Sequence, residues 1–81
     1  MDEFIWTKIE DYYQCEVGGY RFLILKNKER LRHTETYHFY TVQIYRKGKV
    51  QPFDSIPMVD YLKVAKRKCV EYYNEMKRRN V

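Results

Sequence analysis

The chain has 81 residues, of which 33% are charged and 44% hydrophobic, and its formal net charge is +5. This length and balance predict one small globular domain, residues 1–81, and exclude large cofactor-binding folds, which need a longer chain. Aromatic residues reach 17%, and nine of them are tyrosines. The basic charge excludes an acidic DNA mimic and suggests an acidic partner.

The start of the chain lacks the basic residues and apolar stretch of a secretory signal, and no apolar run is long enough to span a membrane. We therefore expect a cytoplasmic protein with no membrane partner. Cys15 and Cys69 lie far apart in the sequence. A disulfide between them is conceivable, but an intracellular chain favours two buried thiols that act as small hydrophobic residues.

The first extended segment covers residues 6–9, and a hairpin follows. Strand-like residues 13–17 and 20–25 flank Gly18-Gly19, and a two-glycine loop is typical of a tight hairpin turn. This turn sets Val17 opposite Tyr20 and predicts an ion pair between Glu16 and Arg21. One face is nearly all apolar and should face the core: it holds Tyr13, Cys15, Val17, Tyr20, Phe22 and Ile24.

Residues 27–36 are polar and predict a long loop, and residues 37–46 predict the next strand. In that strand Tyr40, Val42 and Ile44 form the more aliphatic face and should point to the core. Lys47-Gly48 then turns the chain. Residues 49–51 are a candidate for a short fourth strand, which Pro52 would end.

The last third of the chain predicts a helix. Asp54-Ser55 offers an N-cap, and Pro57 suits a first helical turn. Apolar residues recur every three or four positions and form one stripe: Met58, Leu62, Ala65, Cys69, Tyr72 and Met76. The expected fold is α+β: a three-stranded antiparallel sheet, or four-stranded if residues 49–51 pair, with one C-terminal helix on one face.

Positive charge is concentrated after the first hairpin: residues 1–25 carry −3, residues 26–50 carry +5 and residues 51–81 carry +3. The dense points are the expected loop and the second turn, with Lys26, Lys28, Arg30 and Arg32 in the loop and Arg46, Lys47 and Lys49 in the turn. Clustered lysine and arginine favour contact with nucleic acid phosphates, because binding releases condensed counterions. A solvated surface that keeps the protein soluble is the alternative.

The sheet face away from the helix is a second candidate surface. Arg21, Gln43 and Tyr45 would lie there and suit stacking and base-edge hydrogen bonds. Leu23, Leu25 and Phe39 would add an apolar patch that also suits a protein partner or a second copy of the chain. Alternatively, residues 4–6 fold across this patch and cover it.

Catalytic motifs are missing from the sequence. It contains no glycine-rich phosphate loop and no Cys-x-x-Cys, and no plausible Ser-His-Asp set. A metal site of His33, Glu35 and His38 is conceivable, but solvent-exposed histidines are the commoner explanation of this pattern. We expect no enzyme activity, no cofactor and no metal.

The Gly48-Lys49 turn, the Phe53-Asp54-Ser55 segment and Ala65 in the helix form a recognisable layout. It resembles the three-stranded-sheet-plus-helix modules at the N-termini of tyrosine-type integrases and in plant ethylene-response-type DNA-binding domains. In those families the exposed sheet face enters the DNA major groove. The resemblance covers about half of the chain. The arginine- and tryptophan-rich strand residues that read bases in those families are mostly missing, and Arg21 and Arg46 are the nearest equivalents.

The opening Trp6 and the Gly-Gly-Tyr pattern also resemble small phage and prophage proteins, some of which inhibit host defence, including anti-CRISPR proteins. Three hypotheses follow. The first is a non-enzymatic phage or mobile-element module that binds nucleic acid through the loop, the turn and the open sheet face. The second is an inhibitor that binds a nucleic-acid-processing host protein in the host cytoplasm. The third is a structural homodimer.

Overall fold

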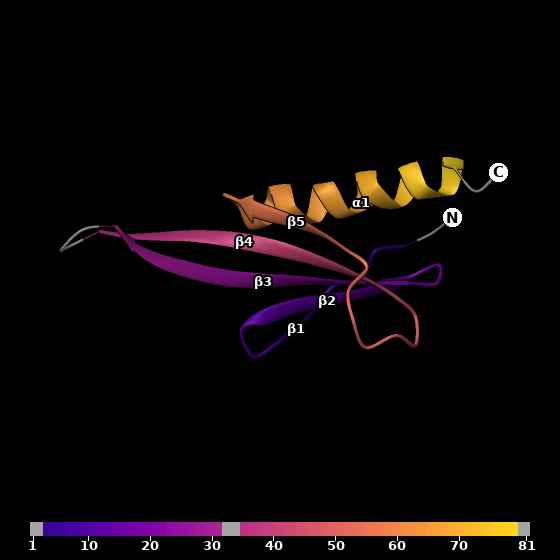
Figure 1. Ribbon diagram of the computed structural model, residues 1–81, viewed down its shortest axis with the longest axis horizontal. Coiled ribbons are helices and arrows are strands. Elements are labelled where there is room, and N and C mark those ends of the chain that lie inside the picture. The colour runs from indigo at the N-terminus through magenta and orange to yellow at the C-terminus, as the bar shows by residue number, and fades with distance from the viewer. Residues whose placement is uncertain (1–2, 32–34, 80–81) are drawn as a thin grey trace.

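The computed structural model describes residues 3–31 and 35–79, and it contains one antiparallel sheet and one helix. The strands are β1 (Thr7–Ile9), β2 (Tyr12–Val17), β3 (Tyr20–Leu31), β4 (Glu35–Arg46) and β5 (Asp54–Val59), and the helix is α1 (Leu62–Arg79). Neighbours in sequence are neighbours in the sheet, in the order β1-β2-β3-β4-β5. The α+β class is confirmed, with five strands instead of three or four (Figure 1).

The β2–β3 hairpin has the predicted register. Val17 pairs with Tyr20 and Glu16 with Arg21, and both turn glycines have positive φ, 54° at Gly18 and 94° at Gly19. Gly18 has a second role, because a Cβ at this position would lie 2.0 Å from the hydroxyl oxygen of Tyr73. The hairpin turn therefore needs glycine both for its backbone and for the approach of the helix.

The prediction of a loop at residues 27–36 is wrong for the described part of this segment, because residues 27–31 lie in β3 and residues 35–36 lie in β4. The ladder between β3 and β4 continues from Lys26 opposite Tyr40 to Leu31 opposite Glu35. The segment is polar, but it contains no proline or glycine to interrupt a strand, and the backbone hydrogen bonds extend along it. Residues 32–34, which include Arg32 and His33, lie outside the described residues.

The outer part of this hairpin has no neighbouring strand on either side. β2 begins opposite Leu25, and β5 ends opposite Tyr40. We call residues 26–31 and 35–39 the arm, and residues 20–25 and 41–46 the body of the hairpin. The arm projects past the start of α1 and gives the molecule its elongated form of 50 × 22 × 22 Å (Figure 1).

The predicted start of the helix is also wrong. Asp54, Ser55 and Pro57 lie in β5, and α1 begins at Leu62. β5 is an edge strand, where a proline is tolerated because one side of the strand needs no backbone donor. Residues 49–51, the candidate fourth strand, are irregular.

The core lies between α1 and one face of the sheet. Its fully buried side chains include Phe22, Ile24, Val42 and Ile44 from the sheet, as the strand alternation predicted. The helix contributes Ala65 and Cys69, with Leu62, Tyr72 and Met76 packed around them. The predicted stripe is confirmed except at Met58, which is 58% exposed because it lies in β5.

The N-terminal segment packs on the same side as the helix. The Phe4 ring centroid lies 6.0 Å from that of Phe22 and 5.6 Å from that of Tyr73. The Lys66 ammonium lies 5.8 Å from the centroid of the Trp6 ring. The alternative in which residues 4–6 cover the opposite sheet face is therefore wrong, because these aromatic rings find aromatic partners beside the helix. No helix within the described residues is long and apolar enough to cross a membrane.

Candidate binding surfaces

The predicted contact residues do not form one surface, because β3 alternates its side chains between two faces of the sheet. They separate into three groups. The first group occupies open-face positions and consists of Arg21, Phe39, Gln43 and Tyr45. The second group occupies alternate positions on the other side of the arm and consists of Lys26, Lys28 and Arg30, and the third lies at the β4–β5 connection and consists of Arg46, Lys47 and Lys49. Arg32 lies outside the described residues. The loop and the open face therefore cannot contact a ligand as one continuous surface.

The arm has one basic face. Lys26 pairs with Tyr40 and Lys28 with His38, and both lysines and the histidine are exposed. Arg30, opposite Thr36, occupies the next alternate position. We call Lys26, Lys28 and His38 the basic arm face. Glu29 occupies a position of the opposite parity, so the strand alternation separates its charge from those of Lys26 and Lys28.

A hollow of about 300 Å³ lies at the root of the arm and is lined by Asp11, Lys26, Asn27, Lys28 and His38. Asp11, from the β1–β2 turn, is its single acidic residue. The Asn27 side chain is held in place because its amide donates to Thr41 Oγ1 at 2.8 Å. The hollow is therefore lined by two lysines and a histidine at the point where the arm leaves the sheet.

The opposite face of the arm is aromatic. The rings of Tyr37 and Phe39 are stacked, with centroids 5.8 Å apart and planes at 22°. The Tyr37 hydroxyl donates a hydrogen bond to Asp60, just before the helix, and this bond, with a smaller effect of burial, raises the pKa of Tyr37. Asp60 thus connects the arm to the segment that leads into α1.

On the open sheet face, Arg21, Tyr45 and Gln43 contact one another. The guanidinium carbon of Arg21 lies 4.6 Å from the centroid of the Tyr45 ring, and the Tyr45 hydroxyl donates to Gln43 Oε1 at 2.9 Å. Tyr45 is only 8% exposed, so its ring is not an open platform for a base. The predicted Glu16–Arg21 ion pair does not form among the described residues, because Arg21 stacks on Tyr45 instead.

The β4–β5 connection holds the third group. The Arg46 guanidinium carbon lies 4.9 Å from the centroid of the Phe53 ring and 5.9 Å from that of Tyr20, a cation–π arrangement. The Lys47 backbone amide donates to the Gly19 carbonyl at 2.9 Å, so this connection lies beside the β2–β3 turn. Lys47 and Lys49 are exposed, at the opposite end of β4 from the arm.

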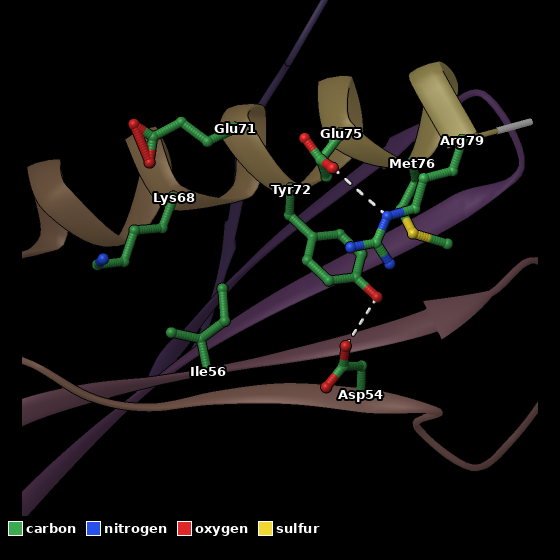
Figure 2. A pocket seen from close by; sticks show the side chains of 8 residues that line it. All are labelled: Asp54, Ile56, Lys68, Glu71, Tyr72, Glu75, Met76 and Arg79. Carbon is green, nitrogen blue, oxygen red and sulfur yellow. Dashed lines mark hydrogen bonds and ion pairs between the residues drawn. The ribbon is translucent and has the colours of Figure 1, made fainter.

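A larger groove of about 570 Å³ runs between β5 and α1 (Figure 2). It is crossed by a hydrogen bond of 2.9 Å from the Tyr72 hydroxyl to Asp54, and Glu75 pairs with Arg79 at 3.4 Å. Burial and the bond to Asp54 raise the pKa of Tyr72 to about 12. The sequence interpretation missed this groove because it assigned Asp54 to a helix cap. Its charges are of both signs and partly paired with one another, so it favours no one class of ligand.

The two thiols belong to the core. Cys15 and Cys69 are free and buried, as predicted. Burial raises the pKa of both thiols, and that of Cys69 reaches about 12, so both are protonated at neutral pH. A protonated, buried thiol is a poor nucleophile. Among residues 3–31 and 35–79, no group of three histidine, cysteine or acidic side chains is arranged to hold a metal ion. His33 of the conceivable metal site lies outside these residues.

Comparison with known proteins gives no match: no family model, no curated protein and no solved structure matches the chain. The layout shared with integrase-type and ethylene-response-type domains therefore stays a resemblance. The Phe53-Asp54-Ser55 segment of that layout leads into strand β5 in this chain.

Proposed function

We propose that the protein is a nucleic-acid-binding module whose β3–β4 arm docks on a double-stranded nucleic acid through its basic face. The observation that carries this proposal is the alternation of Lys26 and Lys28 on one face of a two-stranded arm, with His38 beside them. The basic arm face replaces the predicted combination of loop and open sheet face as the contact surface.

The shape of the arm supports a groove-binding mode. A two-stranded antiparallel ribbon fits the major groove of B-DNA, which is about 12 Å wide. The arm is such a ribbon over residues 26–31 and 35–39, since neither β2 nor β5 accompanies it. The helix covers the body and leaves the arm projecting (Figure 1).

The charges support phosphate contact. Lys26 and Lys28 are exposed, and neither forms an ion pair with any described acidic residue. Each lysine that neutralises a phosphate releases counterions, so the affinity should fall steeply with salt. Arg30 stands at the next position of the same parity along β3.

The test is a salt titration with labelled duplexes. Fluorescence anisotropy with random-sequence DNA and RNA duplexes, from about 50 to 200 mM salt, gives the affinity and its salt dependence. The double variant Lys26→Glu/Lys28→Glu should weaken binding by at least about tenfold, and it should reduce the salt slope by about two.

The matched control is Lys47→Glu/Lys49→Glu, which changes the net charge by the same amount at the other end of β4. We expect this control to keep most of the affinity and the salt slope. Equal losses in the two variants would mean that total charge, and not the arm, determines binding. A wild-type protein that binds neither duplex at 50 mM salt would overturn the proposal.

A further inference from the structure

Among the described residues, no helix covers the sheet face opposite α1 (Figure 1). The helix and the N-terminal aromatic residues pack on the other side, as Phe22 and Tyr73 show by their contacts with Phe4. The open face nevertheless carries Tyr12, Leu23 and Leu25, which are half-buried within one chain. Partly exposed apolar side chains that lie next to one another on a sheet face with no helix over it suit a surface that another molecule covers.

The charge of this face argues against nucleic acid as that molecule. Over the body of the sheet, Glu16 and Arg21 are the only charged residues at open-face positions of the described strands. Their charges cancel, although the whole chain carries +5. A neutral surface gains little from phosphate neutralisation, so the face suits a protein surface of matching shape and charge.

The open face is complementary to itself. Across β2 and β3, Glu16 is opposite Arg21, Gln14 is opposite Leu23 and Tyr12 is opposite Leu25. Consider a two-fold axis that runs along the strands, midway between β2 and β3 and above the face. It superimposes β2 of one copy on β3 of the other, so that Glu16 of each copy faces Arg21 of the second copy. The two reciprocal ion pairs then enclose contacts of Tyr12 with Leu25 and of Gln14 with Leu23.

We propose that this open face is the interface of a homodimer, formed by face-to-face packing of two sheets about that axis. Sheets packed in this way lie about 10 Å apart, with side chains of the two inner faces interdigitating. An interface about a two-fold axis uses the same patch on both copies, so the patch must be complementary to itself. The open face meets this condition, because Glu16 and Arg21 lie opposite each other and carry opposite charges. Because this axis preserves the direction along the strands, the two arms project from the same end of the dimer.

Light scattering after size-exclusion chromatography, and sedimentation equilibrium, test this proposal on the full chain. The wild type should have the mass of a dimer. Glu16→Arg should weaken the dimer by about tenfold or more, because it places like charges opposite each other twice. The charge swap Glu16→Arg/Arg21→Glu should restore the dimer, because it rebuilds both pairs with reversed sign.

Leu23→Glu should give a monomer, and Val50→Glu is its matched control. Val50 is 89% exposed and lies in the β4–β5 connection, so its substitution should leave the mass unchanged. Circular dichroism confirms that each variant is folded. A monomeric wild type at millimolar concentration overturns the proposal. So does a dimer that Leu23→Glu and Glu16→Arg leave intact, or a monomer whose open face binds single-stranded nucleic acid.

Discussion

The body and the arm of the β3–β4 hairpin are built from the same two strands in one unbroken register, but only the body is part of the core. In the body, Phe22, Ile24, Val42 and Ile44 alternate with outward-facing residues and are fully buried beneath the helix. In the arm, the same alternating positions hold Lys26, Lys28, Thr36 and His38. The backbone ladder is equal in the two halves. What differs is the side-chain surface that each half can bury.

This difference separates stability from recognition within one hairpin. The free energy of folding comes largely from apolar surface that leaves water, so the body should determine the stability of the whole domain. The arm buries little apolar surface, and neither of its edges pairs with a further described strand. Its lysines suit such edges, because charged side chains oppose pairing with other strands. The arm is therefore free to carry a row of charges at little cost to the fold.

The largest expected effect comes from replacing one phenylalanine of the body, Phe22, and one of the arm, Phe39, by alanine. Phe22→Ala should lower the free energy of unfolding by about 3–5 kcal/mol, because it removes a fully buried ring and leaves a cavity. Phe39→Ala should cost only about 1 kcal/mol, since its ring is half-buried and, among the described residues, stacks only on Tyr37. Urea unfolding followed by circular dichroism gives both values. Equal costs would mean that the arm belongs to the core.

A smaller effect is expected at alkaline pH. The Cys69 thiol ionises near pH 9 in the unfolded chain, whereas burial raises its pKa to about 12 in the folded protein. Between these values the unfolded state binds fewer protons, so the free energy of unfolding should fall as the pH rises. The slope should approach ~1.4 kcal/mol per pH unit for such a group. Below pH 9 this contribution to stability is fully present.

The control for this pH dependence comes from the arm. Urea unfolding between pH 8 and pH 11 should give a flatter pH profile for Cys69→Ala, whatever its cost at neutral pH. Phe39→Ala should leave the slope of the profile as in the wild type, because the Phe39 side chain in the arm carries no group that titrates. A profile that Cys69→Ala leaves unchanged would exclude the buried thiol as its origin.

The smallest effect concerns the root of the arm. Asn27→Ala removes the amide that donates to Thr41 Oγ1, a bond worth about 0.5–1.5 kcal/mol. Hydrogen exchange should then be faster, by up to about tenfold, at the backbone amides of the arm. The amides of residues 20–25 and 41–46 should exchange as in the wild type. Faster exchange in both regions would show that arm and body open together.

The parts of the fold that follow from local chemistry could be predicted from the sequence. Gly18-Gly19 specifies a hairpin because both residues need positive φ, and this turn fixes the register of six strand positions on either side. The same alternation identified Phe22, Ile24, Val42 and Ile44 as core residues. The apolar period of the last third identified the helix and its buried residues Ala65 and Cys69.

Two segments could not be predicted, because their local sequence is compatible with more than one structure. Residues 27–36 are polar enough for a loop, and only pairing with the opposite strand makes residues 27–31 extended. Asp54, Ser55 and Pro57 suit a helix start, but their segment instead forms strand β5, which pairs with the edge of β4 that β3 does not occupy. These two differences changed the candidate site, because strand alternation separates Lys26 and Lys28 from Arg21, Gln43 and Tyr45.

The sequence alone therefore determined the class of the fold, the β2–β3 hairpin with its register, and most of the core residues. Glycine turns and apolar periodicity act over a few residues, and they need no knowledge of the rest of the chain. Only the tertiary structure decided that Lys26 and Lys28 line one face of a projecting arm and that the open sheet face lacks a helix among the described residues. Those outcomes depend on strand pairing between distant residues and on the side of the sheet that the helix covers.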